Sequence, residues 1–338
     1  MKLKRWFGVL IVSSLLTLML IWGFNYVVDP FGVFGDRFIK WHSYNFVNNP
    51  RIAKIGYLDR NYEKYNGYVI GGSKSSSINP TLLNKYYGGD TNFYGMLMYG
   101  GDFFDYEKTL HYIVENYNVE HIVLHMSMHE MSHYHEVKKA MNNDLHAKVL
   151  GEPLLPFYMK YLSLNLGYGK DKLEGLLKRR YDPMESNQFI PETGVYNKSV
   201  RDSEDLGALE EFLEKYPEFN SPLPKMDSSG AEENLKALAR MKVYCEDRGI
   251  SFMFMVAPTY YREMERYEAE GVQDFLDKAA QITDYWNFSG YNTVSYDARY
   301  FYDPMHYRNN VGEMILAKIF GDKSVEVPED FGEYRIVN

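Results

Sequence analysis

A run of apolar residues without a single charge, from Phe7 to Phe24, stands near the N-terminal end of the chain. At about 1.5 Å per residue, a helix over this run is roughly 27 Å long, close to the thickness of the hydrocarbon core of a bilayer. No alanine occurs before Ala53, so the A-x-A-like site at which a signal peptide is cleaved is absent. The sequence therefore predicts an uncleaved helix that crosses a membrane, with a cleaved signal peptide as the competing interpretation.

The charges beside this run indicate how the helix is oriented. Residues 2–5 carry three basic side chains, whereas Arg37 and Lys40 lie farther from the other end of the run. Because basic residues gather on the cytoplasmic side of membrane helices, we expect a cytoplasmic N-terminal tip and an extracytoplasmic body. Residues 1–28 then form the tip and a single-pass anchor in the cell membrane, and residues 29–66 form a juxtamembrane linker.

Five aromatic residues lie at the outer end of the anchor and in the linker. They fit an aromatic belt at the lipid–water boundary, and they fit equally an apolar linker that folds onto the body. These residues are Trp22, Phe24, Tyr26, Phe31 and Phe34.

Charge and cysteine content narrow the classes of partner and site. The formal net charge is −9, and because the basic tip contains no acid, the remainder of the chain carries about −12. A body of this charge repels polyanions, so nucleic acid is not expected as a partner. Cys245 is the single cysteine, which excludes an internal disulfide and thiol-rich metal sites.

Short apolar strands alternate with amphipathic helices in the body. Since such alternation is typical of parallel sheets, we expect an α/β domain over residues 67–338, with a parallel sheet flanked by helices. The strand candidates are Tyr68–Ile70, Thr91–Tyr94, His121–His125 and Ile250–Val256, and the helix candidates are Asp105–Asn116, Ala231–Asp247 and Asn310–Phe320.

Residues 136–229 depart from this alternation. The segment is polar and punctuated by proline, and it holds short helical patterns such as Asp171–Arg179 and Leu206–Lys215 without a clear strand. We expect a mainly helical insertion that covers the sheet or binds a partner. A small separate helical domain is the alternative.

Ser73 follows the first predicted strand in a glycine-led turn, Gly71-Gly72-Ser73. Such a turn presents a hydroxyl at the carboxyl end of a sheet beside backbone N–H groups, an arrangement that suits a nucleophile. An ordinary serine-rich turn is the alternative. Lys74 does not complete a phosphate-binding loop, because the spacing G-x-x-x-x-G-K-[ST] is absent.

Asp303 and His306 lie three residues apart, just before the last predicted helix. If both side chains share one turn, the carboxylate fixes the tautomer of the imidazole, and the other ring nitrogen takes a proton from a serine. Positioned proton transfer of this kind contributes about 10²- to 10⁴-fold to a rate. A surface turn is the alternative for an isolated Asp-x-x-His.

Together, these two motifs resemble the SGNH (GDSL-like) hydrolase superfamily over about Tyr68 to Phe320. Gly71-Gly72-Ser73 resembles its Gly-Asp-Ser block, with glycine in place of aspartate, and the Asp303 to His306 stretch resembles its Asp-x-x-His block. The resemblance implies a three-layer, flavodoxin-like α/β fold. It also implies that Ser73 is the nucleophile, His306 the general base and Asp303 the partner of the histidine, with no cofactor and no metal ion.

The inner blocks of that superfamily supply oxyanion donors, and here several residues qualify. Gly72 belongs to the first block, and Gly101 is preferred for the second, with Gly95 and Asn92 as further candidates. The third block supplies an asparagine, but the stretch His125–Glu130 contains none. Loss of one donor costs about 10² to 10³ in turnover, so another group is expected to replace it. The candidates for this replacement are Asn92, Ser127 and His129.

The anchor, the Asp29-Pro30-Phe31-Gly32 segment and the two outer motifs together resemble the membrane-anchored DltD-like and AlgJ-like subset of the superfamily. These proteins work outside the membrane beside membrane-bound O-acyltransferases. The resemblance implies that such a partner delivers an acyl group such as acetyl, that Ser73 takes it as an ester, and that a cell-surface polysaccharide or teichoic-type polymer accepts it. Two other functions stay open: an acetylesterase with the same triad, and a non-catalytic scaffold that recruits the acyltransferase through the anchor and residues 136–229.

A second motif, His129-Glu130-Met131-Ser132-His133, fits the H-E-x-x-H pattern of zinc hydrolases. On a long helix this spacing places two imidazoles on one face, with the glutamate as general base. Here the motif follows a predicted strand directly and has no long apolar-periodic helix around it. Hydrogen-bonded or solvated loop histidines are therefore the favoured interpretation, and a zinc site is the alternative.

Overall fold

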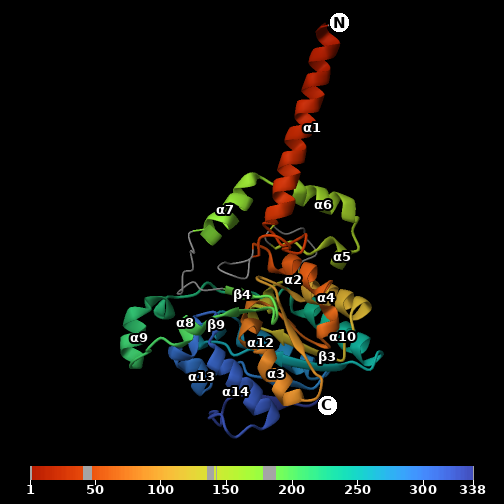
Figure 1. Ribbon diagram of the computed structural model, residues 1–338. Coiled ribbons are helices and arrows are strands. Elements are labelled where there is room, and N and C mark those ends of the chain that lie inside the picture. Colours follow the sequence, from red (N-terminus) through yellow and green to blue (C-terminus); the bar gives the residue numbers. More distant parts are fainter. Residues whose placement is uncertain (1, 41–47, 135–140, 142, 178–187, 338) are drawn as a thin grey trace.

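A six-stranded sheet forms the centre of the body (Figure 1). The strands lie in the order β10-β7-β6-β3-β1-β2, and all neighbours run parallel except β10, which is antiparallel to β7. The strands are β1 (Gly67–Gly71), β2 (Phe93–Leu97), β3 (His121–Met126), β6 (Ser251–Val256), β7 (Tyr285–Asn287) and β10 (Glu333–Arg335). The computed structural model describes residues 2–40, 48–134, 141, 143–177 and 188–337.

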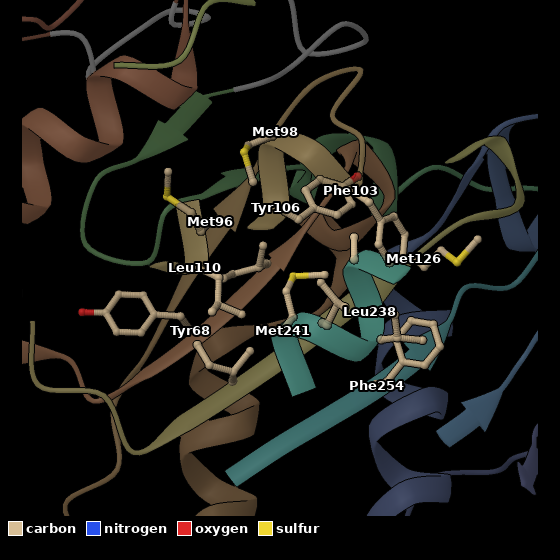
Figure 2. Close-up of a cluster of buried hydrophobic side chains, with 14 of the residues drawn as sticks. Tyr68, Met96, Met98, Phe103, Tyr106, Leu110, Met126, Leu238, Met241 and Phe254 are labelled. Atoms are coloured by element: carbon tan, nitrogen blue, oxygen red, sulfur yellow. The ribbon is translucent and has the colours of Figure 1, made fainter. Parts of the chain in front are cut away.

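Neighbouring residues of each strand enter different apolar clusters, so both faces of the sheet are buried. Tyr68 and Ile70 of β1 belong to one cluster, part of which is drawn in Figure 2, whereas Val69 belongs to the other. Burial on both faces explains the continuous apolar runs of these strands. The first face is covered by α2 (Pro50–Leu58), α4 (Phe103–Asn116), α10 (Ala231–Glu246) and α12 (Ala269–Ala279), and the second by α3 (Pro80–Tyr87), α13 (Thr293–Tyr296) and α14 (Asn309–Phe320). The predicted parallel sheet flanked by helices is confirmed.

The five parallel strands follow the order of a doubly wound α/β sheet, β2-β1-β3-β6-β7. In this order the connections leave β1 and β3 in opposite directions, and a crevice opens outside the carboxyl ends of these two strands. Ligands bind in this crevice in sheets of this kind. Ser73 comes two residues after β1 ends at Gly71, so the topology alone places its hydroxyl there.

Strand β2 begins later than the sequence predicts, at Phe93 rather than Thr91. Asn92 belongs to the turn before the strand, where its side-chain amide donates to the Lys64 carbonyl and accepts from Asn84. Gly95 lies inside the strand. The hairpin of β4 (Gln188–Ile190) and β5 (Val195–Asn197) covers this edge of the sheet so closely that a Cβ at Gly95 would lie 2.7 Å from Val195 Cγ1.

Helix α1 (Lys2–Val28) extends away from the body as a single helix (Figure 1). Its side chains from Lys4 to Leu20 are exposed, and among the described helices it is the one long and apolar enough to cross a membrane. The predicted N-terminal apolar helix is thus present. Its orientation stays a prediction.

The linker after α1 folds back onto the body. Phe31 is buried, with its ring 5.4 Å from Tyr161 and 5.2 Å from Tyr168. The Asp29 carboxylate accepts the backbone N–H groups of Phe34 and Asp36, which closes the turn. Phe31 therefore belongs to a folded linker, not to an aromatic belt.

The insertion is mainly helical within its described residues, as predicted, but it also contains the β4–β5 hairpin. Each strand of this hairpin has three residues, too few for an alternating pattern to be recognised. The end of the predicted helix Asp171–Arg179 lies outside the described residues. The helices are α5 (Ala147–Leu150), α6 (Leu154–Leu162), α7 (Leu166–Leu177), α8 (Ser199–Asp202) and α9 (Leu209–Lys215).

Candidate active site

The nucleophile candidate opens a tight turn at the end of β1. The 3₁₀ segment η3 (Ser73–Ser77) begins there, and the Ser75 N–H and hydroxyl both donate to the Gly72 carbonyl, at 3.1 and 2.7 Å. The rest of this segment is buried, whereas Ser73 is partly exposed. The turn therefore presents one hydroxyl to the crevice.

A short β-hairpin carries the other two candidates. β8 (Phe301–Asp303) and β9 (His306–Tyr307) pair antiparallel, with Asp303 opposite His306 across a two-residue turn. The sequence analysis expects both side chains on one turn, and the hairpin achieves the same juxtaposition by cross-strand pairing. The Asp303 carboxylate also accepts the Met305 N–H at 2.8 Å, which fixes the turn.

The structure brings Ser73, His306 and Asp303 into one chain of hydrogen bonds. Ser73 Oγ lies 2.8 Å from His306 Nε2, and His306 Nδ1 lies 2.9 and 3.0 Å from the two Asp303 oxygens. Burial raises the pKa of Asp303, but the hydrogen bonds from His306 and Met305 outweigh it, so this pKa lies below its ordinary value. An ionised carboxylate only accepts hydrogen bonds, so Nδ1 carries the proton and Nε2 is free to take one from Ser73.

Two further contacts hold the β8–β9 hairpin in place, one to the nucleophile turn and one to the central sheet. Ser77 Oγ donates to the Tyr307 carbonyl at 3.0 Å, and the Tyr307 hydroxyl lies 2.8 Å from Nε2 of His125 on β3. His125 and Tyr307 are both buried. The hydrogen bond between Tyr307 and His125 thus ties the hairpin to the centre of the sheet. The sequence analysis assigns no structural role to His125.

His125 makes the stability of the body sensitive to acid. Burial lowers the pKa of His125 to about 3, whereas an unfolded chain protonates this histidine near pH 6.5. Below pH 6.5 the unfolded state binds the extra proton and the folded state does not, so stability is full above that pH and falls as the pH falls. Between pH 7 and pH 5 this one group lowers the free energy of unfolding by about 2 kcal/mol. Thermal unfolding of the wild type and of His125→Gln at both pH values checks this: the variant should lose about 4 °C less than the wild type. Equal losses in the two proteins would contradict it.

The insertion contributes side chains to both halves of the site, which the sequence did not reveal. Lys198, beside β5, donates to Ser76 Oγ at 2.8 Å, and Arg201 of α8 donates to the Tyr302 carbonyl at 2.8 Å. Burial lowers the pKa of Lys198 to about 8. Lys198 thus contacts the serine turn and Arg201 the hairpin that carries Asp303, so residues 195–202 brace the two elements against each other.

A buried carboxylate forms the floor beneath the nucleophile turn. Glu130 accepts a hydrogen bond from the Ser127 N–H at 2.8 Å, and the Tyr106 hydroxyl, with one proton to share between them, lies 2.8 Å from Glu130 Oε1 and 3.0 Å from the Gly101 carbonyl oxygen. A Cβ at Gly72 would lie 2.8 Å from Glu130 Oε1 and 2.9 Å from the Tyr106 oxygen. This floor explains why glycine occupies position 72, because an aspartate there would place a second carboxylate against Glu130.

Two of the predicted oxyanion donors do not lie at the site. Asn92 stands at the amino end of β2, about 16 Å along the sheet from the carboxyl edge at roughly 3.3 Å per residue. Gly95 is inside β2, and its N–H donates to the Thr193 carbonyl at 2.8 Å. Both predictions are corrected: the late start of β2 shifts these residues away from the crevice.

The other predicted donors lie near the carboxyl edge. The Gly101 N–H donates to the Met98 carbonyl at 3.0 Å, and Ser127 is bound to Glu130, so both groups are already engaged. Within the described residues, the Ser73 N–H takes part in no turn or capping bond. The Ser73 N–H therefore remains a candidate backbone donor beside the Ser73 hydroxyl, and Gly72 stays a predicted donor.

The H-E-x-x-H motif does not form a zinc-binding helix. It lies in the short 3₁₀ segment η4 (Met128–Ser132), and Glu130 points into the floor described above. Burial lowers the pKa of His129 to about 4, and the His129 and His133 rings lie 4.7 Å apart. No group of three or more His, Cys, Asp or Glu side chains in the described part of the chain is arranged to hold a metal ion.

Lys74 has a structural partner. Its ammonium lies 2.6 Å from the Glu263 carboxylate on α11 (Tyr261–Met264), and both side chains are buried. The ion pair holds the residue next to Ser73 against the segment that follows β6.

Helix α14 presses on the same turn through a glycine. A Cβ at Gly312 would lie only 1.8 Å from the Ser77 carbonyl oxygen. Gly312→Ala must separate the helix from the turn, so we expect a loss of about 1–3 kcal/mol of stability and a fall of about 10²-fold in the reactivity of the misplaced serine. Thermal unfolding and the rate at which a serine-directed fluorophosphonate probe labels Ser73 measure the two effects. In the matched control Gly271→Ala, the new Cβ meets the Ser228 hydroxyl at 3.2 Å, and both quantities should stay near wild type. Equal behaviour of the two variants would contradict the contact.

Comparison with known proteins gives no match: no protein-family model and no curated protein matches this chain.

Proposed function

We propose that this protein is a membrane-anchored serine acyltransferase that O-acylates a cell-surface polysaccharide or teichoic-type polymer. The observation that carries the proposal is the hydrogen-bonded chain Ser73–His306–Asp303, at the carboxyl edge of a doubly wound sheet and with a partly exposed serine. A serine held in this way becomes nucleophilic, because the histidine accepts its proton as it attacks.

The reaction proceeds in two balanced steps. Ser73 Oγ attacks the carbonyl carbon of an activated acyl group, His306 takes the serine proton, and the leaving group departs with that proton. A polymer hydroxyl then attacks the acyl-serine and gives its proton to His306, which returns it to Ser73. The Ser73 and Gly72 N–H groups are the donors that we assign to the transient oxyanion.

The membrane arrangement belongs to the same proposal. The basic tip before α1 supports a cytoplasmic N-terminus and an extracytoplasmic body. Resemblance to the SGNH superfamily and its DltD-like and AlgJ-like subset supports a membrane-bound O-acyltransferase as the partner on the donor side. The assembled triad favours this enzyme over a non-catalytic scaffold, since a scaffold does not need a serine bonded to an imidazole.

A fluorophosphonate probe tests the nucleophile in membranes that contain the full chain. The probe is expected to form one covalent adduct, located on Ser73 by mass spectrometry, and to leave Ser73→Ala unmodified. An unlabelled wild-type protein in native membranes, where any partner is present, would sink the proposal.

An acetylesterase is the second candidate, favoured by the fact that the triad is assembled without a partner chain. Water then takes the place of the polymer hydroxyl in the second step. Release of free acetate, measured beside transfer to an oligosaccharide acceptor, separates the two functions. We expect transfer to exceed release when acceptor is present; release unaffected by acceptor would favour the esterase.

A further inference from the structure

The end of α6 and its connection to α7 bind the C-terminal end of α1. Trp22 Nε1 donates to Ser163 Oγ at 3.1 Å, and Asn25 Nδ2 donates to the Leu162 and Leu164 carbonyls at 2.8 and 2.9 Å. Figure 1 shows α6 and α7 on either side of this end of α1, between the free helix and the sheet. We call α6 and α7 together the collar.

The hydrogen bonds of Trp22 and Asn25 fix the position of the collar along α1, relative to its apolar part. The apolar run from Phe7 to Phe24 is followed by the amide side chain of Asn25, which the collar binds together with Trp22, and the first charged residue is Asp29. If α1 spans the bilayer, these residues lie where the hydrocarbon core ends, since the run is about as long as that core is thick. The collar then lies at the boundary between acyl chains and headgroups.

Each collar helix carries an apolar stripe turned away from the body. In α6 the stripe is Leu155, Met159 and Leu162, spaced i, i+4, i+7, whereas Phe157 and Tyr161 pack toward the linker. Leu155 is 73% exposed. Lys160, the one charged residue of α6, lies off this stripe and pairs with Asp144 at 2.6 Å. Leu155 is therefore an exposed apolar side chain on this stripe, and Met159 and Leu162 are half-buried.

The second helix follows this pattern less strictly. Leu166 and Leu177 of α7 are exposed, Leu177 to 82%, whereas Leu173 is half-buried and the exposed Lys170, paired with Glu174, lies beside these leucines. On the opposite side, Lys172 is buried and donates to the Val28 and Asp29 carbonyls at 2.7 and 3.0 Å. Exposed leucines in adjacent helices at the end of a membrane anchor are typical of segments that lie in a bilayer interface.

We infer that the collar lies in the outer bilayer interface, with the leucine stripes of α6 and α7 inserted among the lipid acyl chains. The inference rests on the membrane-spanning role proposed for α1 and is independent of the triad. Lipid is the occupant because the stripes are continuous with the membrane-facing surface of α1 through the contacts at Trp22 and Asn25. A collar seated in this way fixes the height and tilt of the whole body above the membrane.

Depth-dependent quenching tests the collar in the full-length protein. In a Cys245→Ala background, single cysteines at 155 or 177 are labelled with an environment-sensitive fluorophore, and the protein is placed in phosphatidylcholine–phosphatidylglycerol vesicles with brominated acyl chains. Leu16→Cys, in the exposed apolar part of α1, is the control inside the bilayer, and Val243→Cys, 52% exposed on α10, is the control in water.

We expect the labels at 16, 155 and 177 to lose more than about half of their emission, because interfacial helices bury their apolar face about 5–10 Å below the headgroups. The label at 243 should keep its emission. Quenching at 16 with none at 155 and 177 would overturn the collar alone. No quenching at 16 would overturn the anchor, and the collar with it. Shielding of 155 and 177 only in native membranes would assign the stripes to a protein partner and contradict lipid as the occupant.

Discussion

Replacing Ser73 with alanine is expected to reduce acyl transfer by about 10⁴- to 10⁶-fold while the protein stays folded, because the reaction loses the atom that becomes acylated. Ser73 is partly exposed, and its one side-chain hydrogen bond to a described residue runs to His306. Little packing is therefore lost. The measurement is transfer of labelled acyl groups to the polymer in membranes that contain the partner.

Because the triad acts as a unit, its variants should not add. The double variant Ser73→Ala/His306→Ala should be no slower than Ser73→Ala alone, since either change removes the activated hydroxyl. Ser221→Ala, at an exposed serine whose hydroxyl donates to the Pro217 carbonyl, is the matched control and should transfer at the wild-type rate. Transfer by Ser73→Ala within tenfold of wild type would end the catalytic proposal.

Replacing Lys74 with methionine is expected to lower the free energy of unfolding by about 3–5 kcal/mol, because it leaves the Glu263 carboxylate buried without its counter-charge. Glu263 is fully buried, and its other carboxylate oxygen has no partner among the described residues. A loss of this size corresponds to about 5–9 °C in melting temperature for a body of this length.

The double variant Lys74→Met/Glu263→Leu separates the ion pair from simple packing. With both charges removed, the site becomes apolar, and stability should return to within about 1–2 kcal/mol of wild type. Lys236→Met, at an exposed lysine paired with Glu232, is the control and should melt with the wild type. A single Lys74→Met variant that melts like this control would show that the buried pair contributes nothing.

The sequence predicts the fold well where a pattern is local. The run His121–His125 becomes β3 almost residue for residue, and the positions Leu235, Leu238 and Met241 lie on α10 as their spacing indicates. The short strands β4, β5, β7, β8, β9 and β10 are missed because two or three residues do not establish a period. β2 is placed too early because Thr91 and Asn92 directly precede the aromatic pair that opens the strand, whereas side-chain hydrogen bonds hold Asn92 in a turn.

The residues of the candidate site could likewise be predicted where they stand in local motifs, but not where they depend on contacts between distant parts of the chain. Ser73, Asp303 and His306 stand in motifs that are visible within a few residues, and the structure brings them together. Glu130 and Lys198 were not predicted to support the site, because their contacts with Tyr106 and Ser76 span 24 and 122 residues of chain. Such contacts depend on how the sheet is wound, and no local pattern records them.

Ser73 and His306 are 233 residues apart in the chain. Helix α14, which follows His306, packs through Gly312 against the Ser77 carbonyl at the end of the serine turn. If the anchor enters the membrane first, the hydroxyl emerges long before its base has been synthesised. The nascent protein is then chemically silent throughout its own export, and reactivity begins only when the last helix docks. Completion of folding would itself serve as the signal that starts acylation, at the side of the membrane where the polymer is found.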